Sequence, residues 1–148
     1  MDRVTEFLGF HPVLQYVPAE ELIDSRVIME AGVLPYVARR MKSDPEIHRN
    51  LQRINDELKQ ARSIQRFIEL DIAFHKELIA ASGLSPLMAF SDLLAVFFQR
   101  FRESVKKAEW QGGIANHQTI IDGLKRGDVA GADRILREHI ESHRERIR

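Results

Sequence analysis

The chain has 148 residues, of which 44% are hydrophobic and 30% are charged, and its 22 basic residues balance its 22 acidic residues. This length fits one domain with a real core, and the balanced charge provides no overall field that would attract nucleic acid or an anionic membrane. The absence of cysteine excludes disulfides, thiolate metal sites and cysteine nucleophiles, so that His, Asp and Glu remain as candidate metal ligands.

The sequence between its few glycines and prolines is rich in Leu, Ile, Ala, Glu, Arg and Lys, a composition typical of an all-α domain. No apolar run is long enough to span a membrane and the N-terminus has no signal-peptide pattern, so we expect a cytoplasmic protein. Residues 1–19 show no clear periodicity, and we expect a linker or tail there. Residues 20–148 should form one helical domain.

Two helices are predicted in the first part of this domain. The first begins near Glu20 and ends near Met41, with a kink or a split at Pro35, because proline removes a backbone hydrogen bond. The second has Ser43 or Asp44 as its cap and Pro45 in its first turn, residue types that favour a helix N-terminus. Its predicted core face is a stripe of apolar residues at spacings of three and four: Ile47, Leu51, Ile54 and Leu58.

The stretch FIELDIAFHKELI, residues 67–79, predicts a third helix that ends at Ser82–Gly83. Ser85–Pro86 then begins a fourth helix, which is long and strongly apolar. We expect this fourth helix to lie at the centre of the bundle, because a helix that is apolar on all sides is buried.

Two more helices are predicted in the last part of the chain. Gly112–Gly113 is predicted to interrupt the helical structure, and a fifth helix follows over about 114–126. Gly127 ends this helix, since glycine is the preferred residue at a helix C-terminus, and Asp128 caps a sixth helix that runs to the end of the chain.

Four polar residues interrupt the apolar faces of these helices. Asp71 and His75 lie one turn apart on the core face of the third helix, and His117 and His139 lie on the core faces of the fifth and sixth. Each unpaired buried polar group costs about 1–3 kcal/mol, and one shared divalent ion would satisfy all four. The alternative is a buried ion pair of Asp71 with a histidine, the other histidines being bonded to backbone carbonyls. His143, one turn beyond His139, is a reserve ligand.

Neutral imidazoles with one carboxylate suit a divalent transition metal such as Zn, Ni, Co, Fe or Mn. An octahedral site with four protein ligands would leave two positions for water or for the oxygens of a ligand. Arg26 and Glu30 on the first helix are candidate effector-binding residues, because arginine recognises carboxylates in a bidentate manner. An Arg26–Glu30 pair within the helix is the alternative. Arg100 is a further effector-binding candidate.

The chain resembles the FadR C-terminal domain (FCD) family, the effector-binding half of many bacterial GntR-type transcription regulators, over about residues 20 to 145. The stretch ELIDSRVIMEAG resembles the opening helix of that family, whose arginine matches Arg26 and commonly lies at the effector pocket. The other matching positions are a set with characteristic spacing: Asp71, His75, Ala81–Ser82–Gly83, His117, Gly127–Asp128 and His139.

The resemblance implies an antiparallel bundle of six or seven helices that binds one divalent metal through Asp71, His75, His117 and His139. It further implies a small carboxylic acid held against the metal, and a homodimer. Regulators of this kind contact DNA through an N-terminal winged helix-turn-helix domain, for which these 148 residues have no room. We therefore expect a non-enzymatic, metal-dependent sensor of a small organic acid. The alternatives are a metalloenzyme acting on such an acid and a dimerisation module with a structural metal.

Overall fold

A computed structural model of the chain describes residues 16–100 and 106–146, apart from the side chains of residues 93, 98–100 and 146. This described part contains seven α-helices and one short 3-10 helix, and it has no strand. The all-α bundle predicted from the sequence is confirmed. In chain order, its elements are α3 (Ala19–Met41), α4 (Pro45–Lys59), α5 (Ile64–Ala81), α6 (Ser85–Met88), α7 (Leu93–Arg100), η2 (Lys107–Glu109), α8 (Trp110–Arg126) and α9 (Val129–Arg146).

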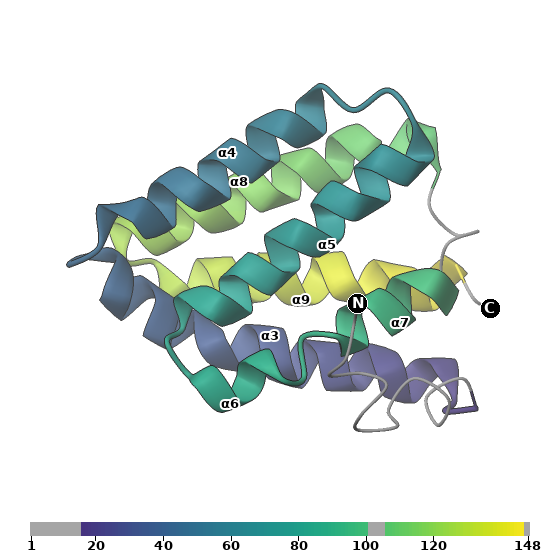
Figure 1. Ribbon diagram of the computed structural model, residues 1–148, viewed down its shortest axis with the longest axis horizontal. Coiled ribbons are helices and arrows are strands. Elements are labelled where there is room, and N and C mark those ends of the chain that lie inside the picture. Colours follow the sequence, from purple (N-terminus) through teal and green to yellow (C-terminus); the bar gives the residue numbers. More distant parts are fainter. Residues whose placement is uncertain (1–15, 101–105, 147–148) are drawn as a thin grey trace.

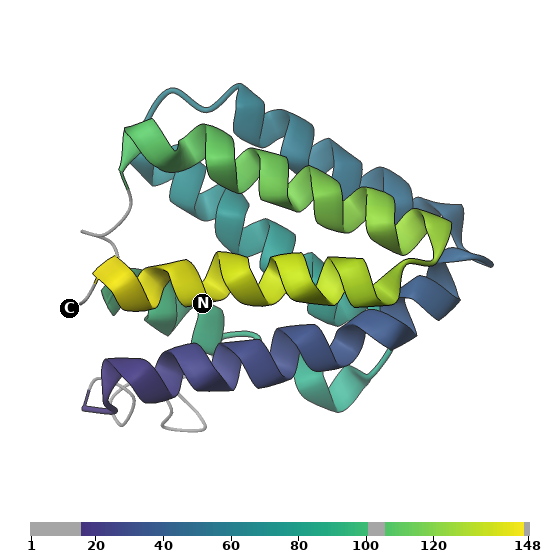
Figure 2. The ribbon, with the colours of Figure 1, turned by 180° about the vertical axis from the view of Figure 1, so that it is seen from behind.

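The long helices pack against one another with α9 between α3 and α8 (Figure 2). α4 and α8 lie side by side along one edge of the molecule, and α5 crosses the bundle on the face opposite α9 (Figure 1). The colours in Figure 2 show that α9 runs antiparallel to both α3 and α8. None of the helices in the described ranges combines the length and the apolarity that spanning a bilayer requires.

Local sequence signals account for the boundaries of α4 and α9. The side chain of Asp44 caps α4 by accepting a hydrogen bond from the Glu46 backbone N–H at 3.1 Å, and Pro45 occupies the first turn. Gly127 ends α8 with a φ of 85°, a left-handed conformation that glycine adopts without strain. Asp128 then accepts a hydrogen bond from the Gly131 N–H at 3.0 Å. Of the two candidate caps of α4, Asp44 is the one formed, and the predicted Gly127 stop and Asp128 cap are confirmed.

The first predicted helix is not split at Pro35. α3 is continuous from Ala19 to Met41. Val33, Leu34 and Val37, on either side of the proline, are almost completely buried, so the packing of these turns offsets the one backbone hydrogen bond that proline removes.

The predicted fourth helix begins at Ser85 as expected, but two shorter helices, α6 and α7, replace the single long one. The predicted burial holds for α7, where Leu94, Val96 and Phe97 are at most 2% exposed, and is wrong for α6, which has no buried residue. Met88 and Phe90 are each 41% exposed. The hydroxyl of Ser91 donates to the Met88 carbonyl oxygen at 2.8 Å, a local side-chain bond of the type that competes with continued helix.

The predicted break at Gly112–Gly113 is also wrong, because α8 begins at Trp110 and includes both glycines. The Trp110 ring stacks on Phe67 with 4.5 Å between ring centroids, so packing fixes the start of the helix. Each glycine in a helix interior costs about 1 kcal/mol relative to alanine. A Cβ atom on Gly113 would lie at an ordinary van der Waals distance, 3.6 Å, from Cε1 of His139, and one on Gly112 would meet no atom within 4 Å.

Candidate metal and effector site

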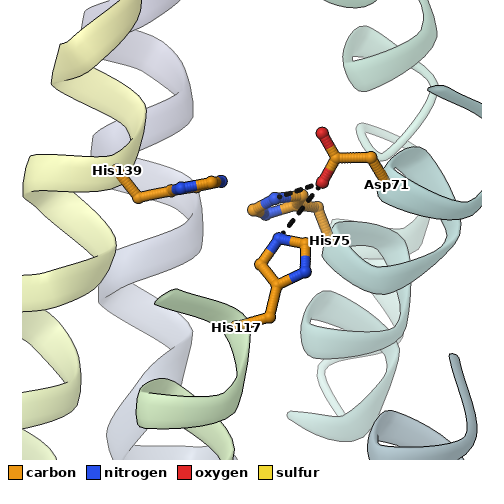
Figure 3. Close-up of side chains that lie close together, drawn as sticks. All are labelled: Asp71, His75, His117 and His139. Carbon is orange, nitrogen blue, oxygen red and sulfur yellow. Dashed lines mark ion pairs between the residues drawn. The ribbon is translucent and has the colours of Figure 1, made fainter. Parts of the chain in front are cut away.

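The centre of the bundle contains a cluster of one aspartate and three histidines, shown in Figure 3. Asp71 and His75 come from α5, His117 from α8 and His139 from α9. One nitrogen or oxygen atom from each of the four side chains lies within 4.8 Å of the corresponding atoms of the other three. The structure therefore brings together the four residues that the sequence analysis selected as metal ligands.

The cluster is organised around one carboxylate oxygen. Oδ1 of Asp71 lies 3.2 Å from Nε2 of His75 and 3.1 Å from Nε2 of His117 (Figure 3). Asp71 Oδ1 and His117 Nε2 are both buried, and neither makes a hydrogen bond of good geometry within the described residues. Buried polar atoms of this kind are costly unless a partner satisfies them.

The opposite ring nitrogens of the two histidines bond to side chains outside the cluster. Nδ1 of His75 donates to Oε1 of Glu30. Nδ1 of His117 lies 3.3 Å from Oδ1 of Asn55, whose amide nitrogen donates to the Ile114 carbonyl oxygen at 3.2 Å. Since Glu30 and this amide oxygen only accept, the neutral form of each ring carries its hydrogen on Nδ1. Two Nε2 lone pairs then face one carboxylate oxygen, an arrangement that a cation satisfies.

The ionisation of the cluster fits this chemistry. Burial would raise the pKa of Asp71, but the nearby His117 and His75 rings hold it well below its usual value. Burial lowers the pKa of His117, and it lowers the pKa of His139 further because His117 and His75 lie nearby. An ionised carboxylate and neutral imidazoles are the forms that bind metal ions.

His75 is the exception among the three histidines. Burial is the largest single influence and lowers its pKa, but the charge of Glu30, the hydrogen bond to Glu30 and the nearby Asp71 carboxylate together outweigh it, and the net result is a raised pKa. Burial would raise the pKa of Glu30 itself, but Arg26 and His75 lower it to about 2. A proton on His75 is therefore the main competitor for a metal ion in this cluster.

A cavity of about 300 Å³ adjoins the cluster at Asp71 and His139. Trp110, the single tryptophan of the chain, forms part of its wall. The remaining lining includes both glycines of the first turn of α8, the polar side chains of Asn116 and Ser142, and the exposed Lys106. The cavity is large enough for a small organic acid and borders the side chains that would hold a metal.

The other predicted site residues lie around this centre. Nε of Arg26 donates to Oε2 of Glu30 at 2.5 Å, so the pair within α3 that the sequence analysis gave as the alternative is formed. His143 also lines the 300 Å³ cavity, with its ring edge-on to Phe97 at 5.1 Å, but it is not part of the four-residue cluster. The side chain of Arg100 lies outside the described residues.

Sequence reasoning missed the two amide side chains that contact the histidines. Asn55 is fully buried beside His117, and the Asn116 side-chain nitrogen lies 3.2 Å from Nδ1 of His139. Asn55 had a detectable signal, because it lies next to Ile54 and three residues before Leu58, at the edge of the apolar stripe of α4. Asn116 had no such signal, because it lies outside the apolar stripe predicted for α8.

The comparisons with known proteins agree with this picture. A protein-family model described as the FCD domain matches residues 21–142, a range that includes all four residues of the cluster. No curated protein matches the chain. Because the family model covers most of the sequence, the chain belongs to the FCD family, the effector-binding domains of GntR-type transcription regulators.

Proposed function

We propose that this domain is a metal-dependent sensor of a small carboxylic acid in a GntR-type transcription regulator. Asp71, His75, His117 and His139 would hold one divalent transition metal ion, and the acid would occupy the adjoining cavity. The observation that carries this proposal is the meeting of two histidine Nε2 atoms at a buried carboxylate oxygen, beside a cavity of about 300 Å³.

The donor set suits Zn, Ni, Mn or Fe, because imidazole with one carboxylate is a common environment for these ions. When bound, the ion would supply the positive charge that a carboxylate needs in a helical core. The chain itself contributes polar groups for the rest of the acid. The Asn116 amide and the Ser142 hydroxyl line the cavity, and the Lys106 ammonium lies in its exposed part.

The second candidate function is a metalloenzyme that acts on a small organic acid. Such an enzyme needs a general base with a pKa near the working pH. Glu30, the buried carboxylate that contacts the cluster from α3, has a pKa of about 2 because Arg26 and His75 hold it ionised against the effect of burial. This carboxylate is a poor proton acceptor, which favours a sensor. Turnover of any acid that binds would support the enzyme instead.

Replacing a metal ligand should remove the metal. We expect the purified domain to contain one divalent ion per chain, and we expect His117→Ala and His139→Ala to lose it, because each removes a ligand from the cluster. Elemental mass spectrometry of the purified proteins measures the metal content. His48→Ala, which removes a histidine from α4 outside the cluster, is the matched control and should keep the ion. Full metal content in both cluster variants would show that the ligand assignment is wrong.

We further propose that the domain forms a homodimer, that DNA contact is made by a winged helix-turn-helix domain and not by this one, and that the protein acts in the cytoplasm. Exposed apolar residues on α3 and α6 support the dimer. Ile28 on α3 is 74% exposed, and Met88 on α6 is 41% exposed. A groove of about 430 Å³ between these helices is lined mostly by apolar side chains, including Ile28 and Leu87.

Sedimentation at micromolar concentration should give a species of about twice the 17.1 kDa chain mass. We expect Ile28→Glu to shift this species toward the monomer, because a charge would have to be buried in the interface. Ile64→Glu, at an exposed apolar position at the start of α5, is the control and should remain dimeric. A 17 kDa species from the unmodified chain would refute the dimer.

A further inference from the structure

We propose that Glu30 is a positioning residue that aims the His75 ring at the metal, and that Arg26 acts on the site through Glu30. This inference rests on the metal site proposed above. It adds to that site two residues of α3, a helix that contributes none of the four candidate ligands.

The contacts of Glu30 define this role. The side chain is fully buried, with Oε1 accepting from Nδ1 of His75 and Oε2 accepting from Nε of Arg26 at 2.5 Å. An ionised carboxylate has no hydrogen to donate, so the bond requires the hydrogen of His75 to be on Nδ1. Nε2 is then the atom available to a metal, and it lies 3.2 Å from Oδ1 of Asp71. Carboxylates that hold a ligand histidine in this way fix the ring and raise its basicity.

The position of Arg26 fits a supporting role for Glu30. Its side chain is 3% exposed, and its guanidinium carbon lies 4.5 Å from the centre of the Phe97 ring. It lines a separate cavity of about 240 Å³, whose lining includes Leu22 and Met29 but none of the four cluster residues. A buried carboxylate is costly without a cation, and Arg26 supplies that cation from one turn earlier in the same helix.

Glu30 differs from the outer partners of the other two histidines. Asn55 and Asn116 hold His117 and His139 through neutral amides. Among the described residues, Glu30 is the carboxylate that contacts the cluster from outside it. Its replacement should therefore change both the orientation and the electron donation of one ligand, and both properties can be measured on the metal itself.

The test uses the full chain titrated with Co²⁺, whose visible absorption reports its ligand environment. We expect Glu30→Gln to weaken Co²⁺ binding about 10- to 100-fold and to shift the absorption bands, because the glutamine retains the size of the side chain and loses its charge. Asp24→Asn, which removes the same charge from an exposed position on α3, is the matched control. Its affinity should stay within about twofold of the unmodified chain, and its spectrum should be unchanged.

A second variant covers the case in which Glu30→Gln does not fold. Arg26→Gln should also weaken Co²⁺ binding, because Glu30 loses the cation that holds it. Wild-type affinity and spectrum in a folded Glu30→Gln protein would overturn the inference, as would wild-type Co²⁺ affinity in Arg26→Gln. If the unmodified chain binds no stoichiometric Co²⁺, the proposed metal site itself fails. If that chain binds Co²⁺ and the variants match it, only the role of Glu30 and Arg26 fails.

Discussion

The metal-loaded domain should melt about 8–16 °C higher when its acid is present at a thousandfold excess over the dissociation constant. A ligand that binds only the folded form raises the free energy of unfolding by roughly 4 kcal/mol at this excess. For a chain of 148 residues, each kcal/mol corresponds to a shift of about 2–4 °C. A thermal melt followed by circular dichroism, repeated over a panel of di- and hydroxycarboxylic acids, measures the effect and identifies the acid.

Two controls separate the acid site from general stabilisation. His139→Ala removes a candidate ligand that borders the 300 Å³ cavity, so its melting temperature should not respond to the acid. Arg26→Gln should keep the shift once metal is saturating, because Arg26 lines a different cavity. The sensor proposal would be refuted if no acid in a broad panel shifted the melting temperature of the metal-loaded protein.

Acidification should release the metal, with the affinity falling about tenfold per pH unit once the pH is below the pKa of His75. A ligand histidine must be neutral, and His75 has a raised pKa because the Glu30 charge, together with the hydrogen bond to Glu30 and the nearby Asp71 carboxylate, outweighs the opposite effect of burial. His75 therefore takes up its competing proton first as the pH falls. Burial lowers the pKa values of His117 and His139, so these rings compete only at lower pH.

Calorimetric metal titrations between pH 8 and pH 5.5 measure both the affinity and the protons released. The charged and titratable groups that face His75 from the packed helices are Glu30 and Arg26 on α3, Asp71 on α5, His117 on α8 and His139 on α9. A constant affinity over this range, with no proton release, would remove histidine from the proposed ligand set.

The helices that could be predicted from the sequence are those with local signals. The stripe of α4, its cap at Ser43 or Asp44 and the Gly127 stop of α8 each depend on neighbouring residues, and the structure agrees with all three, with Asp44 as the cap. The errors arose where contacts between residues far apart in the sequence determine helix boundaries and burial. α8 begins before its two glycines, because the Trp110 ring packs on Phe67. Met88 and Phe90 are exposed, although the apolar sequence around them had predicted that this region lies in the core.

The cluster could be selected from the sequence because helical periodicity places each member on a core face, and polar residues are rare there. Periodicity does not give the partner of each side chain. Glu30 and Arg26 were predicted as effector-binding residues, and periodicity gave no sign that Glu30 contacts His75 or that Arg26 contacts Glu30. Residues 30 and 75 approach each other only because α3 packs on α5, and that pairing is tertiary information.

The order of the ligands along the chain has a consequence for biosynthesis. His75 and His139 are 64 residues apart, and α9, which carries the last ligand, is also the helix that packs on both α3 and α8. At translation rates of about 5–20 residues per second, roughly 3 to 13 seconds separate the synthesis of these two histidines. Throughout that interval the nascent chain carries Arg26, Glu30 and Asp71 without the helix that completes their enclosure. Ion capture by all four ligands is therefore a late event in the synthesis of this domain, available only after α9 has been translated.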